Sequence, residues 1–207
     1  MVSRRLAISF TRIPLQREHT MTPFSVHTIE SAPAASKPLL ASAERAYGFL
    51  PNLLSGMATS PALLEGYMTL SGIFNKTSLS ETERQIVLLT ASRIHSCTYC
   101  MAAHSFISTS SGVCADVVAA LRNNTPIADA KLESLRQFAI LMVNSRGWPE
   151  PAQLQAVLAA GYSGQTVLEV ILGISLKVMS NYANHMVQTP VDAVFTPHTW
   201  ADGKAVK

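Results

Sequence analysis

The stretch Glu81–Ile94 constrains the fold of this chain more than any other segment. Its apolar residues fall on nearly every side of a helix: Ile86, Val87, Leu88, Leu89, Ala91 and Ile94. Ser80 and Glu83 form the Ser-x-x-Glu pattern of a capping box just ahead of this run. A helix that is apolar all round must be enclosed by other elements. We therefore expect this helix to lie at the centre of the core.

Further helices are predicted on both sides of this centre. Proline, glycine and capping residues mark their ends, as at Ser60-Pro61 and at Gly147. The predicted helices are 39–49, 61–75, 97–112, 113–122, 129–146, 151–160 and 164–187. The sequence thus predicts an all-α chain, with one helical domain over residues 22–200 whose core lies at about 80–112, and a tail at 201–207.

Composition narrows the class of protein. The net charge is +3, and much of the excess comes from four arginines near the N-terminus, so the rest shows no basic stripe for nucleic acid. No apolar run reaches the roughly 18 residues that a membrane span requires. Three cysteines, an odd number, fit a reducing compartment better than a secreted disulfide framework. We expect a cytoplasmic protein that binds neither nucleic acid nor membrane.

Residues 1–21 form a separate segment that is rich in arginine and serine and has no acidic residue before Glu18. Such a composition is also found in mitochondrial transit peptides, which is the alternative. We prefer to interpret it as an N-terminal extension that is either disordered or over-called, meaning that the start of the chain is assigned too far upstream.

The pattern Cys97-x-x-Cys100-x-x-x-His104 carries the chemistry of the chain. If Cys97 opens a helix, the three side chains lie on one face, and the two thiols are close enough to form a disulfide with little backbone movement. The helix N-terminus favours a thiolate, and His104 could hydrogen-bond the Cys100 sulfur and move its proton. The pattern predicts a redox-active thiol pair whose side chains project together into a pocket reached by solvent.

Two further interpretations compete for the same cysteines. A zinc site would need Cys97, Cys100, His104 and His95, but His95 should point away from the face shared by the others, and no second CxxC completes a site. The pair could also be idle core cysteines, although cytosolic CxxC pairs are usually catalytic. We therefore expect no metal. Cys114, which has no neighbouring thiol or histidine, is predicted to fill the core.

The segments Glu83-Arg84-Gln85-Ile86-Val87-Leu88-Leu89, Ser92-Arg93 and Cys97-x-x-Cys100-x-x-x-His104-Ser105 stand in this order along the chain. They resemble the core of the alkyl hydroperoxidase D-like (AhpD-like) branch of the carboxymuconolactone decarboxylase superfamily. The resemblance to its peroxidase-related members extends from about Phe24 to Trp200, through Pro51-Asn52-Leu53, Ser60-Pro61-Ala62-Leu63-Leu64, Gly147-Trp148, Leu168-Glu169-Val170 and Ser180-Asn181-Tyr182.

The resemblance implies roles for individual residues. Cys100 would attack the peroxide, Cys97 would resolve the sulfenic acid into a disulfide, and His104 would belong to a proton relay. The family's relay glutamate falls on Gln85, which cannot carry a proton away. Glu83 and Glu169 are the candidate replacements, although Glu83 also fits the capping box, and Glu169 could instead pair with Lys177 or a backbone group.

The function that follows is a thiol-dependent peroxidase for organic hydroperoxides, acting in antioxidant defence without a cofactor. A dithiol reductant of the lipoyl-protein, thioredoxin or glutaredoxin type would reopen the disulfide. The family's usual trimers or hexamers, and the abundance of apolar helices, lead us to expect a homo-oligomer. The alternatives are a lactone decarboxylase, the superfamily's other activity, and a non-enzymatic redox sensor or assembly module.

A weak internal repeat appears when the sequence is shifted so that Ser80 meets Ser163. Both segments begin with a buried helix and continue into a polar helical stretch, so a duplicated helical unit is plausible. In this register Cys97 falls on Ser180, and the residues Asn181, Asn184 and His185 are predicted to line a degenerate site or a subunit contact, unless His185 simply ends its helix.

Overall fold

The computed structural model describes residues 24–201, and this part of the chain contains helices and no strand. The proposed extension 1–21 and nearly all of the tail lie outside the described residues. The helices are α1 (Lys37–Tyr47), α2 (Asn52–Met57), α3 (Pro61–Phe74), α4 (Glu81–Ile94), α5 (Thr98–Ser110), α6 (Ala115–Asn123), α7 (Ala130–Ser145), α8 (Pro151–Ala159), α9 (Gly164–Val187) and a 3-10 helix, Ala193–His198. The all-α prediction is confirmed.

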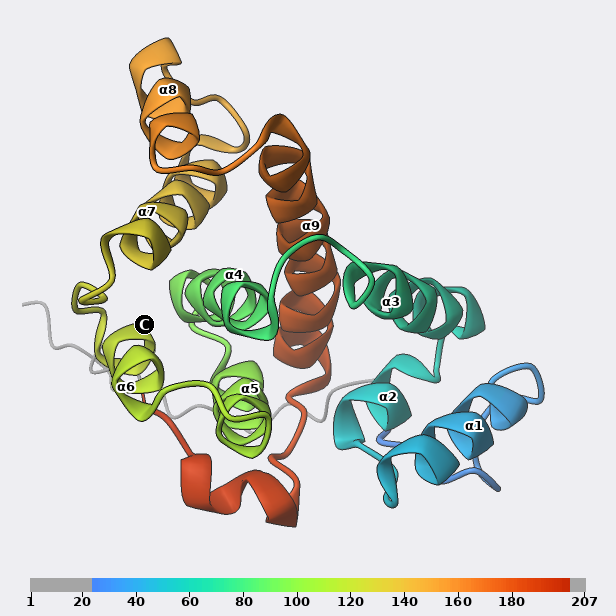
Figure 1. Cartoon of the computed structure of the whole chain (residues 1–207). Coiled ribbons are helices and arrows are strands. Elements are labelled where there is room, and N and C mark those ends of the chain that lie inside the picture. Colours follow the sequence, from blue (N-terminus) through green and yellow to red (C-terminus); the bar gives the residue numbers. More distant parts are fainter. Residues whose placement is uncertain (1–23, 202–207) are drawn as a thin grey trace, which may run out of the picture.

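Helix α4 occupies the centre of the fold, as its apolar sequence predicts. It packs against α5, α6, α7 and α9 (Figure 1). The capping box at its start is present: the Ser80 backbone N–H donates to Glu83 Oε2 over 2.8 Å, and the Glu83 N–H donates to Ser80 Oγ over 3.3 Å. These contacts satisfy backbone groups that a helix start leaves unpaired.

Helix α9 is the second central element. It packs against α4 and also contacts α2 and α3 (Figure 1). At Gly173 the helices approach so closely that a Cβ would lie 2.7 Å from the Phe74 ring and 2.8 Å from Val87. By length and composition α9 is the one described helix that could span a membrane. Its buried polar residues Lys177 and Asn181 instead mark it as a core helix.

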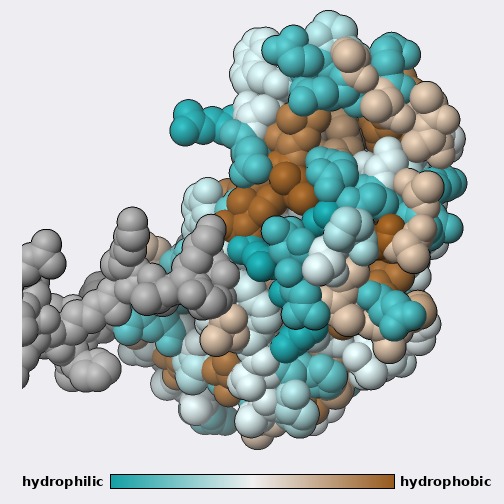
Figure 2. All heavy atoms as spheres, turned by 90° about the vertical axis from the view of Figure 1, so that its left-hand side faces the viewer, coloured by the Kyte–Doolittle hydropathy of each residue, from teal (hydrophilic) through white to brown (hydrophobic). Residues whose placement is uncertain are grey.

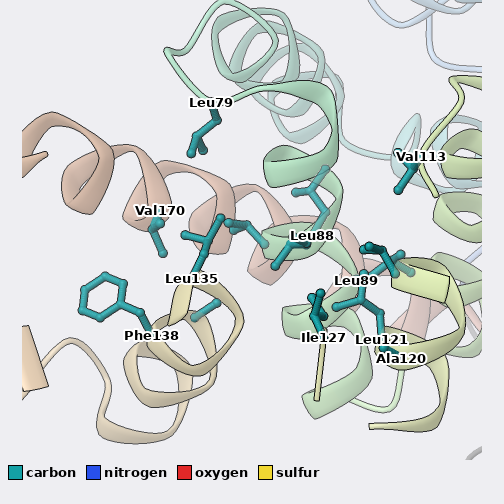
Figure 3. Packing of buried hydrophobic residues seen from close by; sticks show 14 of the residues in the cluster. Leu79, Leu88, Leu89, Val113, Ala120, Leu121, Ile127, Leu135, Phe138 and Val170 are labelled. Atoms are coloured by element: carbon teal, nitrogen blue, oxygen red, sulfur yellow. The ribbon is translucent and has the colours of Figure 1, made fainter. Parts of the chain in front are cut away.

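Two groups of buried apolar side chains fill the interior. The larger one lies between α4, α6, α7 and α9, and Figure 3 shows Leu88, Leu121, Leu135 and Val170 within it. The smaller one lies among α1, α2, α3 and α5, and it includes both cysteines of the CxxC pattern. The thiols are thus part of a packed interior.

Several details differ from the sequence prediction. Helix α2 and the 3-10 helix were not predicted, because a segment of six residues gives little periodic signal. The prediction that Cys114 fills the core is wrong: it is exposed at the N-cap of α6, where the chain turns at the surface. The two copies of the internal repeat also differ in structure. The first copy is broken into α4 and α5, whereas α9 covers the corresponding part of the second copy without a break.

Candidate functional site: a buried thiol pair

A tight connection between α4 and α5 positions the two thiols. Ser96 adopts a left-handed conformation with φ of 55°, and the Cys97 N–H donates to the Ser92 carbonyl over 2.9 Å. Cys97 then becomes the N-cap of α5 with extended backbone angles, and Cys100 lies in the first turn of that helix. This arrangement brings the Cys97 thiol to hydrogen-bonding distance of the Cys100 sulfur, with both cysteines free.

Helix α9 supplies the polar surroundings of the pair. The Asn184 amide donates to Cys100 Sγ over 3.2 Å and lies 3.7 Å from Cys97 Sγ. The Ser180 hydroxyl lies 3.9 Å from Cys100 Sγ. One amide group therefore contacts both sulfurs, as a fixed donor for whichever one carries negative charge.

Lys177 is the central charged group of the site. Its side chain is fully buried, and its Nζ lies 3.0 Å from His104 Nε2. Among the described residues no carboxylate lies within ion-pair distance of Lys177. A buried ammonium group without an anion would be costly. The Cys100 thiolate, which Lys177 also hydrogen-bonds, is the anion that can balance it.

The pKa values of the two cysteines move in opposite directions. Burial raises the pKa of the Cys100 thiol, but the hydrogen bond from Cys97 and the positive charge of Lys177 outweigh it and hold that pKa well below its usual value. The hydrogen bond to Cys100 and burial raise the pKa of Cys97. The surroundings therefore favour the thiolate form at Cys100 and the neutral thiol at Cys97.

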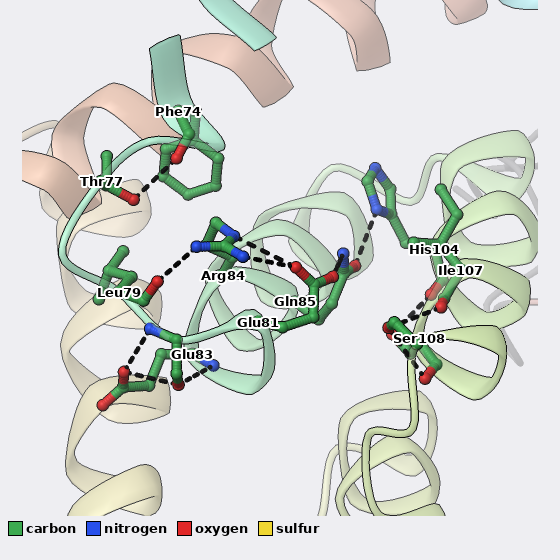
Figure 4. Close-up of polar contacts among 12 residues, drawn as sticks. Phe74, Thr77, Leu79, Glu81, Glu83, Arg84, Gln85, His104, Ile107 and Ser108 are labelled. Carbon is green, nitrogen blue, oxygen red and sulfur yellow. Dashed lines mark hydrogen bonds and ion pairs between the residues drawn. The ribbon is translucent and has the colours of Figure 1, made fainter. Parts of the chain in front are cut away.

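A hydrogen-bonded chain leads away from Lys177, and Figure 4 shows its part from His104 through Gln85 to Glu81. Because the ammonium group of Lys177 donates to Nε2 of His104, the ring carries its proton on Nδ1, which donates to Gln85 Oε1 over 3.0 Å. The Gln85 amide in turn donates to Glu81 Oε1 over 2.8 Å, and Arg84 pairs with the other oxygen of Glu81 at 2.7 Å. Burial and the charge of Lys177 lower the pKa of His104 well below its usual value, so the ring is neutral.

Glu81 is thus the carboxylate at the end of the chain from His104. It stands one helical turn before Gln85 on α4, and this spacing could have identified it in the sequence. Gln85, which stands where the sequence resemblance predicts a glutamate, passes a hydrogen bond from the imidazole to Glu81 but not a proton.

The two predicted relay carboxylates lie elsewhere. Glu83 closes the capping box with Ser80, and Glu169 accepts hydrogen bonds from the Ser78 backbone and hydroxyl and from Gln165. Both ring nitrogens of His104 are already occupied by other groups. The structure therefore does not bring Glu83 or Glu169 to the relay.

Two further expectations need correction. His104 was expected to hydrogen-bond the Cys100 sulfur, but its Nε2 contacts Lys177, which stands between the imidazole and the thiolate. The thiols were also expected in a pocket reached by solvent, but each cysteine is only 1% exposed. The first difference arises from α9, whose lysine side chain occupies His104 Nε2. The second arises from the apolar side chains of α1, α2 and α3 that pack in one cluster with the two cysteines.

The sequence prediction missed Lys177 and underrated its neighbours on α9. Lys177, Ser180 and Asn184 stand at i, i+3 and i+7, which is the spacing of one helical face. Asn184 was predicted to line a degenerate site or a subunit contact, and it contacts the thiols themselves. A lysine and an asparagine on one face of an otherwise apolar helix are a signal that could have identified this face.

The surrounding histidines have other partners. His95 Nδ1 lies 2.9 Å from Asn181 Oδ1, and its ring contacts Tyr182. His185 stacks on Tyr182 in the last turn of α9. Within residues 24–201 no three histidine, cysteine or acidic side chains gather as metal ligands would.

Comparison with known proteins shows the fold. No protein-family model matches the sequence, and no curated protein matches it. An AhpD-core, uncharacterized peroxidase-related protein from Ralstonia eutropha JMP134 superposes with a TM-score of 0.71 at 17% identity, covering 86% of this chain and 96% of the other. A peroxidase-related protein from Silicibacter sp. TM1040 gives 0.70 at 18%, covering 87% and 97%.

A third similar structure has a different stated activity. It is a variant of the debrominase Bmp8 in complex with 2,3,4-tribromopyrrole, with a TM-score of 0.72 at 18% identity, covering 86% of this chain and 96% of the other. At these identities the comparisons establish a shared helical architecture.

Proposed function

We propose that this chain, which has the AhpD-like helical fold, is a thiol-dependent oxidoreductase that reduces organic hydroperoxides. The observation that carries this proposal is the buried Lys177 ammonium group beside Cys100. A thiolate is the nucleophilic form of cysteine, and a neighbouring cation is a common means of producing it. The second thiol lies within reach to complete a two-electron reaction.

The first step is attack by the Cys100 thiolate on an oxygen of the hydroperoxide. The O–O bond breaks, Cys100 becomes a sulfenic acid, and the alkoxide that leaves takes up one proton to become the alcohol. Lys177, which hydrogen-bonds the reacting sulfur, supplies that proton and is later reprotonated from solvent. His104 accepts a hydrogen bond from Lys177 and orients its amine.

The second step closes the disulfide. Cys97 attacks the sulfenic sulfur of Cys100, an S–S bond forms, and water leaves with the thiol proton of Cys97. The hydrogen bond between the two thiols places Cys97 for this attack before the sulfenic acid is oxidised further. An external dithiol, of the lipoyl-protein, thioredoxin or glutaredoxin type, then reduces the disulfide by exchange and restores both thiols.

Reductive dehalogenation of a halogenated aromatic compound is the second candidate function. The similarity to Bmp8, a debrominase solved with a brominated pyrrole, supports it. The apolar surroundings of the thiols, which include Tyr99 and Phe195, also suit an aromatic substrate. This reaction and peroxide reduction each take two electrons from a dithiol, so the same thiol pair could serve either.

A lactone decarboxylase and a redox sensor fit this site less well. A lactone decarboxylase has no use for a thiolate and a resolving thiol. A redox sensor would use the thiol pair, but it would not need a proton donor held beside the thiolate. The thiol pair of a sensor would oxidise and be reduced again without catalytic turnover, whereas an enzyme would consume many peroxide molecules.

Self-association is also part of the proposal. Helix α9 leaves Leu168 and Met186 exposed by 67% and 61%, as apolar surface that a partner subunit could cover. A homo-oligomer in a reducing, cytoplasmic environment fits this surface and the free thiols. Light scattering coupled to size-exclusion chromatography measures the subunit number.

A coupled turnover assay tests the proposed function. Purified protein, dithiothreitol and cumene hydroperoxide are mixed, and peroxide loss is followed for wild type, Cys100→Ser, Cys97→Ser and the matched control Cys114→Ser. We expect many turnovers for wild type and Cys114→Ser, and loss of turnover for the other two. Parallel reactions with tribromopyrrole measure debromination. Equal peroxide loss by wild type and the double mutant Cys97→Ser/Cys100→Ser would contradict the peroxidase.

A further inference from the structure

The side of α9 that points away from the thiols carries a stripe of uncharged side chains that are exposed or partly exposed. The members of this outer stripe are Leu168, Ile171, Ser175, Met179, Tyr182 and Met186. At about 3.6 residues per turn, the six positions fall within an arc of about 80° around the helix. Lys177 and Asn184, which contact the thiols, lie on the opposite side of α9. The outer stripe is therefore separate from the proposed active site.

The outer stripe lacks the charges that a water-facing helix normally carries. Between Glu169 and His185, Lys177 is the only charged residue of α9, and its side chain is buried. The hydroxyl of Ser175 donates to the Ile171 carbonyl over 2.9 Å, so this polar group in the middle of the stripe has a partner. On the side of the molecule that carries α6 and α7, hydrophilic side chains lie between the hydrophobic ones (Figure 2). A long apolar face without charges is typical of a surface that another molecule covers.

Helix α3 widens this uncharged face. Its exposed positions Ala62, Gly66, Thr69 and Ile73 stand at i, i+4, i+7 and i+11, which is the spacing of one helix face. A Cβ at Gly66 would lie 3.5 Å from Met179 Cε, so this face of α3 adjoins the outer stripe of α9.

The area of the combined face suits a stable protein interface. Two neighbouring helices with axes about 9 Å apart and a stripe about 27 Å long give roughly 500 Å² in projection. The accessible area is larger than this projection, because it follows the side chains. Stable interfaces bury about 800 Å² on each partner. The faces of α9 and α3 thus supply most of the area that a stable pair of subunits needs.

The spacing of the outer stripe indicates which molecule covers it. Leu168 and Met186 lie nine residues on either side of Lys177. Ser175 and Met179 lie two residues on either side of it, and the remaining pair departs from this symmetry by one residue. Two copies of α9 that pack antiparallel therefore place Leu168 of one copy against Met186 of the other. A two-fold interface between identical subunits requires such self-complementarity, whereas an unrelated partner would not.

We propose that this chain pairs with a second copy of itself about a two-fold axis near the middle of α9, with the two α9 helices antiparallel and the exposed face of α3 beside them. The small side chain of Ser175 lies close to this axis and allows the helices to approach. The proposal specifies the interface of the self-association proposed above. It does not depend on the thiol chemistry, because the interface lies on the opposite side of α9 from Lys177.

A charge placed near the axis tests the interface. Ser175→Arg sets a long cationic side chain against Met179 of the second copy, whereas within one subunit the exposed position leaves it in solvent. We expect the subunit number, measured by light scattering coupled to size-exclusion chromatography, to halve. Ser42→Arg, the same change at an exposed serine of α1, should keep the wild-type number. Circular dichroism checks that both variants fold as wild type does.

Cross-linking tests the antiparallel arrangement. In a full chain with Cys97→Ser, Cys100→Ser and Cys114→Ser, Leu168→Cys and Met186→Cys are made as separate variants. After mixing and mild oxidation we expect a disulfide-linked pair of chains in the mixture and none in either variant alone. In the antiparallel pair the two copies of residue 168 are about 27 Å apart along the helices. A link in Leu168→Cys alone would overturn the proposal.

Other results would also overturn it. One is a wild-type protein that is a single subunit, and another is a Ser175→Arg variant that keeps the full subunit number. A single wild-type subunit that sediments with vesicles of phosphatidylcholine and phosphatidylglycerol would assign the face to a membrane instead. Peroxide turnover of wild type and Ser175→Arg is measured separately, so a failure of the interface is distinguished from a failure of the proposed peroxidase.

Discussion

The Lys177 ammonium nitrogen lies 3.0 Å from Nε2 of His104, and it also hydrogen-bonds the sulfur of Cys100. The lysine thereby separates the imidazole from the thiolate. It makes His104 an acceptor that holds Lys177 in place, and it makes Lys177 the source of positive charge beside the Cys100 sulfur. The thiolate depends on a residue from α9, more than seventy positions along the chain from the cysteines.

Removing the Lys177 charge should raise the pKa of Cys100. In Lys177→Met the apolar side chain keeps most of the volume, while burial still favours the neutral thiol. We expect the thiolate absorbance near 240 nm to appear at higher pH than in wild type and peroxide turnover at pH 7 to fall tenfold or more. Lys76→Met, at an exposed lysine, is the control. An unchanged titration would rule out Lys177 as the stabilising charge.

Restoring a carboxylate at position 85 should change the titration of His104. Gln85→Glu places a negative charge at the Nδ1 side of the ring, where Gln85 Oε1 now lies 3.0 Å away. An adjacent carboxylate favours the imidazolium, so we expect the pKa of His104 to rise by about one unit or more. Histidine resonances in NMR spectra recorded against pH measure this change. A fall in the pKa would show that the ring does not face residue 85.

The two glutamates of the first turn of α4 should have separable effects. Glu81→Ala removes the acceptor of Gln85, so the amide loses its orientation and turnover should fall severalfold. Glu83→Ala breaks the capping box and should lower the free energy of unfolding by about 1 kcal/mol while leaving turnover nearly unchanged. Chemical denaturation and the peroxide assay, run on both variants, check this. The reverse pattern would assign the relay to Glu83.

The thiol pair should make stability depend on pH. The pKa of Cys100 is lower in the folded state than in the unfolded state, so ionisation of Cys100 stabilises the fold. This stabilisation is fully present above the usual thiol pKa and is lost as the pH falls through the folded-state pKa. The pKa of Cys97 is raised in the folded state, so the neutral Cys97 thiol stabilises the fold. This stabilisation is fully present below the usual thiol pKa and is lost as the pH rises through the folded-state pKa.

The pair therefore stabilises the fold most near pH 8.5, about the usual thiol pKa. We expect the difference in Tm between wild type and Cys100→Ser to grow as the pH rises from 5 to 8.5, with Cys114→Ser following wild type throughout. Calorimetric scans under reducing conditions provide the measurement. A difference in Tm that is flat across this range would mean that Cys100 is protonated in the folded protein.

The sequence by itself determined the local features of this protein. Apolar periodicity and end signals located α4 and α9 at their observed bounds, because caps, prolines and hydrophobic faces act within a few residues. The Ser80–Glu83 capping box and the placement of the two cysteines at the start of α5 are equally local. These features depend on neighbours along the chain.

Only the tertiary structure decided what surrounds the thiols. Lys177 and Asn184 reach them because α9 packs against α4 and α5. Glu81 rather than Glu169 ends the hydrogen-bonded chain from His104, because Glu169 lies beside Ser78. The burial of a charged side chain and the balance between its desolvation and its partner are set by groups distant in the sequence. A buried lysine and an exposed one have the same letter in a sequence, and packing alone distinguishes them.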